Sequence, residues 1–158
     1  MGTVPKAWTK DAAARRKRPT VYKGVDLEQE AWRYCQALGY KRNVELQVVH
    51  SARLGSEGRQ WLMVTKLTIG YEADLAHVLE TLLHEICHAT HMDHSEAFIS
   101  LCVHAARDIW GITIDGWDKV EQGKASCRAY AVDEFLRHRL AEKLAAGEYR
   151  PVQFTHSP

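Results

Sequence analysis

The sequence predicts an α+β fold in which a small twisted β-sheet packs on one helix and further helices complete the core. Two β-rich runs, residues 43–52 and 60–70, stand between segments of helical periodicity, and the second run leads directly into an amphipathic segment. The chain has 158 residues, of which 46% are hydrophobic and 26% are charged, so it can bury one core. We predict an N-terminal arm over residues 1–20 and a single domain over residues 21–158.

The arm is basic, with six Lys or Arg residues against one acidic residue and no clear period. We interpret it as a mobile, solubilising segment, and we rank a nucleic-acid contact through it second. The net charge of +1 gives no reason to expect nucleic-acid binding by the chain as a whole.

The first helix is expected over residues 26–39, with Asp26 as its N-cap and Gly39 as its stop. The run RLGSEGR, residues 53–59, is then expected to join the two β-rich runs as a hairpin connection. Residues 61–69 are our candidate for a strand that binds an extended peptide by β-augmentation, although an internal, fully paired strand is the alternative.

Two more helices are expected after the motif-bearing helix. One runs from about Glu96 to Ile109, and the other from about Ala125 to Ala146, ending at Gly147. The segment between them is loop-like. Four apolar residues of the last helix are expected to pack: Ala131, Phe135, Leu140 and Leu144.

The motif HExxH occurs in the run HEICHATHMDH, residues 84–94. Because four residues make a little over one helical turn, His84 and His88 project from the same helix face and could bind one zinc ion. Glu85 lies beside the first histidine, where it could accept a proton from water as a general base. An apolar helical stripe runs up to and into the motif and consists of Leu75, Leu79, Leu82 and Ile86. This stripe favours an active-site helix over a polar surface helix.

A catalytic zinc needs a third protein ligand, and we assign His94. If the helix ends near residues 91–93, His94 can turn back toward the metal, and Asp93 or Ser95 can cap the next helix. His91 lies about 10 Å along the helix axis from His84, so we interpret it as a supporting or solvent residue. Asp108 is the carboxylate alternative and ranks behind His94.

The run HEICHATHMDHSEAF resembles the metal-binding core of SprT-like metallopeptidases and of small metallohydrolases from actinobacteria and their phages. In that family HExxH is followed by a third histidine in a short HGxxF-type element, matched here by His94 and Phe98, while Ser95 replaces the glycine. The resemblance implies a minimal zincin-like domain. The spacing also equals that of metzincins, with His91 in place of their glycine, but no methionine after Met92 could form the metzincin Met-turn.

We predict a zinc-dependent metallopeptidase in which His84, His88 and His94 hold the ion and Glu85 transfers the proton to the leaving amine. A protein or peptide is the expected substrate. Four residues are candidates to stabilise the oxyanion: Tyr130, His104, Arg107 and Tyr149. The alternatives are a zinc-binding interaction module without catalysis and a metal-dependent amidase acting on a non-protein or cell-wall peptide substrate.

The remaining features favour a cytoplasmic protein of a bacterium or a phage-infected host. No apolar run approaches the roughly 18 residues of a membrane span, and no signal peptide is recognised, so no membrane contact is expected. The cysteines are widely spaced and are expected to be buried reduced thiols: Cys35, Cys87, Cys102 and Cys127. The sequence makes no prediction of oligomeric state.

Overall fold

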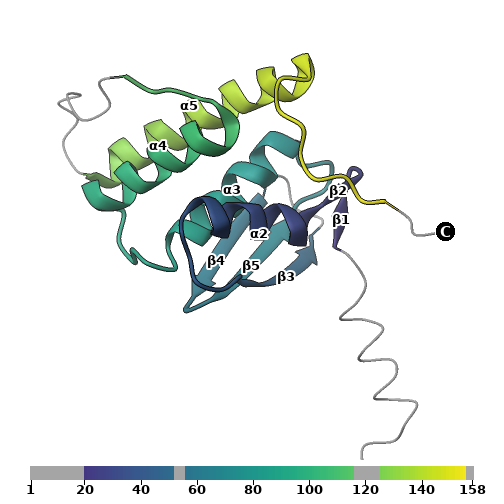
Figure 1. Ribbon diagram of the computed structural model, residues 1–158, viewed down its shortest axis with the longest axis horizontal. Helices are drawn as coiled ribbons and strands as arrows, with labels where there is room; N and C mark the ends of the chain where they lie inside the picture. Colours follow the sequence, from purple (N-terminus) through teal and green to yellow (C-terminus); the bar gives the residue numbers. More distant parts are fainter. Residues whose placement is uncertain (1–19, 52–55, 116–124, 156–158) are drawn as a thin grey trace, which may run out of the picture.

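The predicted α+β class is confirmed by a computed structural model, which describes residues 20–51, 56–115 and 125–155 (Figure 1). The predicted basic arm lies outside these residues, apart from Thr20. A short hairpin of β1 (Val21–Tyr22) and β2 (Val25–Asp26) leads into the first helix. No helix among the described residues is long and apolar enough to cross a membrane.

The main sheet has three strands in the order β3-β5-β4. The central strand β5 (Val64–Ile69) pairs in parallel with β3 (Glu45–His50) and antiparallel with β4 (Ser56–Trp61). The expected hairpin connection over residues 53–59 is therefore wrong, because all of its described part, residues 56–59, belongs to β4. Our candidate for the peptide-binding strand, residues 61–69, is mainly the fully paired β5, whereas β4 is an edge strand.

The polarity of β4 explains this error. Its sequence, SEGRQW, has one large apolar residue and an internal glycine, a composition typical of a turn. The sequence RLGSEGR therefore resembled a connection. In β5, by contrast, buried and half-buried residues alternate, so that Leu67 and Ile69 point into the core.

The first helix, α2 (Leu27–Ala37), has the predicted ends. Asp26 caps it by accepting a hydrogen bond of 3.1 Å from the backbone N–H of Gln29. Gly39 follows it with a φ of 75°, the left-handed conformation that glycine adopts most easily. The side chain of Glu30 in this helix is fully buried and accepts hydrogen bonds from the C-terminal segment, at the Tyr149 hydroxyl and at the backbone N–H of Val152.

The motif-bearing helix α3 (Leu75–Cys87) contacts the sheet and each of the other helices in the described part of the chain. It is followed by α4 (Glu96–Trp110) and α5 (Ala125–Ala146), which lie side by side in Figure 1. Both helices begin at the predicted residues. However, α3 ends four residues earlier than the expected range of residues 91–93.

The buried apolar residues form one cluster that draws on α2, the sheet and all three later helices. The predicted packing face of α5 is only partly right. Leu140 is buried, but Ala131 and Phe135 are exposed, and the buried face is formed instead by Ala129, Val132, Leu136 and Leu140. Three cysteines are buried free thiols, as predicted: Cys35, Cys87 and Cys102. The side chain of Cys127 lies outside the described residues.

Candidate metal centre

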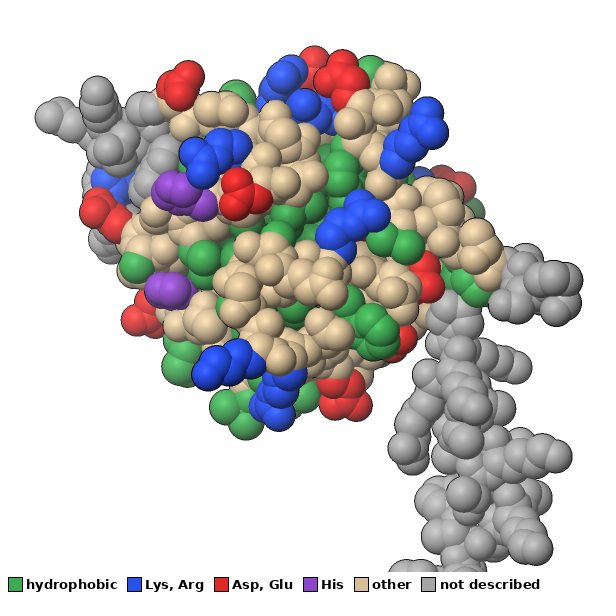
Figure 2. Space-filling model, in the orientation of Figure 1, with side chains coloured by type: hydrophobic (Ala, Val, Ile, Leu, Met, Phe, Trp, Pro, Cys, Tyr) green, Lys and Arg blue, Asp and Glu red, His purple; other side chains and the backbone are tan. Residues whose placement is uncertain are grey.

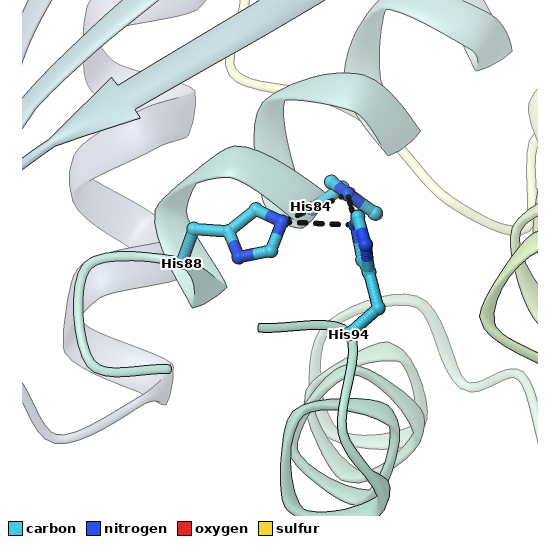
Figure 3. Close-up of side chains that lie close together, drawn as sticks. All are labelled: His84, His88 and His94. Atoms are coloured by element: carbon cyan, nitrogen blue, oxygen red, sulfur yellow. Dashed lines mark hydrogen bonds between the residues drawn. The ribbon is translucent and has the colours of Figure 1, made fainter. Parts of the chain in front are cut away.

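The structure brings the rings of His84, His88 and His94 together around one point (Figure 3). The Nε2 atom of His94 lies 3.1 Å from the Nε2 atoms of both His84 and His88, and the latter two are 3.2 Å apart. Three nitrogens bound tetrahedrally to one zinc ion at about 2.0–2.1 Å would lie about 3.3–3.4 Å from one another. The three histidines thus form a group with the donor atoms and spacing for a zinc ion.

The end of α3 creates this arrangement. His84 is in the last helical turn, and His88 is the C-cap residue, still with right-handed helical dihedral angles. Their side chains therefore keep the i, i+4 relation although the regular helix ends at Cys87. The chain then turns, and His94 precedes the N-cap residue of α4, so its ring approaches the other two from a second element.

Hydrogen bonds fix the orientation and tautomer of two of the imidazoles. The Nδ1 atom of His88 lies 2.7 Å from the backbone carbonyl oxygen of His91, and the Nδ1 atom of His84 lies 3.2 Å from the carboxylate of Asp133. A carbonyl oxygen only accepts, so the Nδ1 atom of His88 must donate, and the Asp133 carboxylate offers an acceptor to the Nδ1 atom of His84. The Nε2 atoms of His84 and His88 then carry lone pairs that face each other, which a shared cation would stabilise.

The surroundings also favour neutral imidazoles. Burial lowers the pKa of His88 and of His94, and the neighbouring histidines lower both further. Phe98 stacks on the ring of His88 with 4.2 Å between centroids and makes edge contacts with the other two rings. Phe98 is itself buried, so its ring covers one side of the histidine group.

Glu85 lines an open cavity of about 330 Å³ together with the three histidines. This cavity also reaches the edge strand, at Gly58 and Gln60. Burial raises the pKa of the Glu85 carboxyl, and the Asp133 charge adds to this rise while His84 opposes it. A carboxyl group with a raised pKa beside a candidate metal group suits proton transfer near neutral pH.

A second cavity of about 230 Å³ adjoins Glu85 on the side of α5. Asp133 and Arg137 line it, and the Nε atom of Arg137 donates a hydrogen bond of 2.6 Å to the buried carboxylate of Glu80. Burial, together with the nearby Asp133 charge, raises the pKa of Glu80 well above its usual range. Glu80, His84 and Asp133 also lie close enough to form a second possible ligand group, which shares His84 with the first.

The model of one family, the WLM domain, matches residues 71–149, which is half of the chain. The chain belongs to the WLM domain family. This domain is of the SprT-like, zinc-metalloprotease type, so the sequence resemblance is confirmed at that level, though not for actinobacterial or phage proteins in particular. No curated protein and no solved structure matches the chain.

The WLM match contains α3, α4 and α5, and with them every histidine of the candidate metal group and Asp133. Sequence reasoning missed Asp133, because it lies 45 residues after His88 on a helix whose packing face was only partly predicted. It also missed the role of the His91 backbone. The side chain of His91 contacts Thr90, while its carbonyl oxygen orients His88.

The other ligand and oxyanion candidates lie elsewhere. The exposed carboxylate of Asp108 pairs with Arg107 on the outer part of α4, and His104 bonds to Ser100 of its own helix. Tyr149 is buried, and its hydroxyl, which would have to stabilise an oxyanion, donates a hydrogen bond to Glu30 instead. None of the four oxyanion candidates is among the described residues that line the two cavities.

Proposed function

We propose that this WLM domain is a zinc-dependent peptidase whose reaction takes place in the cavity shared by Glu85 and the three histidines. The observation that supports it most strongly is the convergence of the three Nε2 atoms in a cavity that the Glu85 carboxyl group also lines. A purely structural zinc site is usually closed by four protein ligands, whereas a catalytic site has three and an open position. Here the described residues supply three.

When bound by His84, His88 and His94, zinc would polarise a substrate carbonyl and lower the pKa of a water molecule. Glu85 is the group that accepts the proton of the attacking water and later returns it to the leaving amine. Asp133 and the His91 carbonyl hold the His84 and His88 rings in the orientation that presents Nε2 to the cavity. Phe98 excludes water from the opposite side.

The edge strand β4 supports a peptide as the substrate. One side of β4 pairs with β5, and among the described strands no other pairs with its second side. Three of its residues, Gly58, Arg59 and Gln60, line the cavity of the histidines. An extended peptide that paired with this edge would therefore pass in front of Glu85, and the main-chain hydrogen bonds would hold it in register.

The first prediction tests this function with Glu85→Gln. Glutamine keeps the shape of the side chain but cannot accept a proton, so we expect zinc content and Tm to stay close to those of the wild type. Hydrolysis should fall at least about 100-fold, the usual scale for loss of a general base. Zinc is measured by metal analysis, and cleavage is measured on unfolded proteins and peptide libraries.

The matched control is Glu45→Gln, the same chemical change at an exposed position of β3. It should leave cleavage unchanged. Equal cleavage by wild type and Glu85→Gln would assign the chemistry to another residue and contradict the proposal. Zinc binding without cleavage by either protein, but with capture of a common partner, would favour a zinc-binding interaction module instead. Cleavage confined to cell-wall peptides or other amides would favour the amidase alternative.

A further inference from the structure

Gly58, in the middle of the edge strand β4, lies directly against the side chain of Glu85. A Cβ atom built on Gly58 would be 2.3 Å from the Cγ atom of Glu85, 3.0 Å from its Cδ atom and 3.1 Å from its Oε2 atom. Carbon atoms in van der Waals contact are about 3.5–4.0 Å apart. No side chain at position 58 is therefore compatible with the observed position of Glu85.

The backbone conformation does not explain the glycine. Gly24, Gly39, Gly111 and Gly147 have positive φ angles, but Gly58 does not, and it pairs with Leu67 in regular antiparallel register. Glycine weakens the interior of a strand, because it has no side chain to pack and loses more conformational entropy on folding. The space taken by Glu85 is thus the feature that requires glycine here.

The contact also defines where the Glu85 carboxyl group lies. Gly58 and Glu85 together line both cavities, the one with the three histidines and the one with Asp133 and Arg137. The clash involves Cγ, close to the helix backbone, so Glu85 could relieve it only by rotating about χ1 or by moving α3 away from β4. Either change would take the carboxyl group from its position beside His84.

We propose that Gly58 is a positioning residue, and that the bare backbone of β4 forms a wall that holds the Glu85 side chain beside the three histidines. The steric part of this inference stands on the contact alone. Its catalytic consequence rests on the proposed peptidase function. The wall is supplied by a strand that precedes the WLM match, so the residues before the match complete the candidate site.

The steric part is tested by Gly58→Ala in two backgrounds, wild type and Glu85→Ala. In the wild type we expect Tm to fall by roughly 3 °C or more, because Glu85 or α3 must move to make room for the new Cβ atom. In Glu85→Ala the Cγ, Cδ and Oε atoms are gone, so Gly58→Ala should leave Tm unchanged or raise it, as usual for a strand interior.

The loss of the destabilisation when Glu85 is absent is the result that a role of Gly58 in the backbone conformation of β4 alone would not produce. An equal effect of Gly58→Ala in both backgrounds, including no effect in either, would overturn the proposal. If Gly58→Ala alone does not fold, the double variant still decides, because it should fold. Lys66→Ala, on the next strand and the other face of the sheet, is the control and should shift Tm equally in both backgrounds.

The catalytic part is tested in the same proteins once a cleaved peptide is known. Gly58→Ala should retain zinc and keep KM near the wild-type value, while kcat falls about 10-fold or more, because only the proton acceptor is displaced. An unchanged kcat would overturn the catalytic consequence. If the wild type cleaves nothing, the proposed function fails, and the Tm comparison still decides the steric part separately.

Discussion

At the scale of single residues, the sequence motif predicts the side chains that converge but not those that orient them. The spacing of His84 and His88 follows from the helix period, and His94 needs only a chain turn after the helix. Asp133 reaches His84 through the packing of α5 on α3, which depends on contacts distant in the sequence. No local pattern marks such a residue, and the same holds for Gly58 in the edge strand.

Asp133→Asn removes the charge that fixes the His84 ring, so we expect zinc affinity to fall about 10- to 100-fold while all three imidazoles remain present. Competition with a chromophoric chelator measures the affinity. Asp108→Asn, a change at an exposed carboxylate on α4, is the control and should bind zinc like the wild type. Wild-type affinity in Asp133→Asn would show that the Asp133 carboxylate does not support the His84 ligand.

At the scale of elements, helices were predicted well because their signals are local. The apolar period, the cap at Asp26 and the glycine at residue 39 all lie within or next to α2. Strand pairing is not local, and the parallel pairing of β3 with β5 could not be distinguished from a hairpin. The connection between α3 and α4 also differs from expectation, because the helix ends at Cys87 and a longer turn carries the chain to His94.

Ser95 stands where the HGxxF-type element has glycine, yet α4 still begins at the same place, because serine can also cap a helix. Its hydroxyl accepts a hydrogen bond of 3.3 Å from the backbone N–H of Phe98, which caps α4. Serine and glycine are both favoured at an N-cap, because serine satisfies a free N–H group and glycine leaves it open to water. The replacement therefore keeps His94 and Phe98 in the same relation to the helix.

Two substitutions at Ser95 test whether its hydroxyl caps α4. Ser95→Ala should lower the free energy of unfolding by about 1 kcal/mol, whereas Ser95→Gly should lower it by only a few tenths. Denaturant unfolding of the zinc-free protein measures both. Ser100→Ala, at a half-buried position within the same helix, should not show the loss of a cap. Equal losses for alanine and glycine would show that the Ser95 hydroxyl does not cap α4.

At the scale of the whole molecule, one core joins the WLM match to the elements that precede it. The match holds the histidines, while α2, β4 and β5 lie before it and pack against α3. On the face drawn in Figure 2, acidic and basic side chains are interspersed, in keeping with the net charge of +1. Composition could predict this one core and mixed surface, but it could not predict that β4 would form a wall of the candidate site.

Zinc should therefore stabilise the whole domain, because its proposed ligands come from α3 and from the segment that enters α4. A ligand that binds only the folded state at a free concentration about 1,000 times Kd stabilises that state by about 4 kcal/mol. For a chain of this size the corresponding rise in Tm is about 8–16 °C. The rise should appear in wild type and in His91→Ala, whose backbone carbonyl still orients His88, and it should be much smaller in His94→Ala. Thermal unfolding of the three proteins, with chelator and with added zinc, measures this rise in Tm. If zinc raises the Tm of His94→Ala fully and does not raise that of His91→Ala, the third ligand is His91 and not His94.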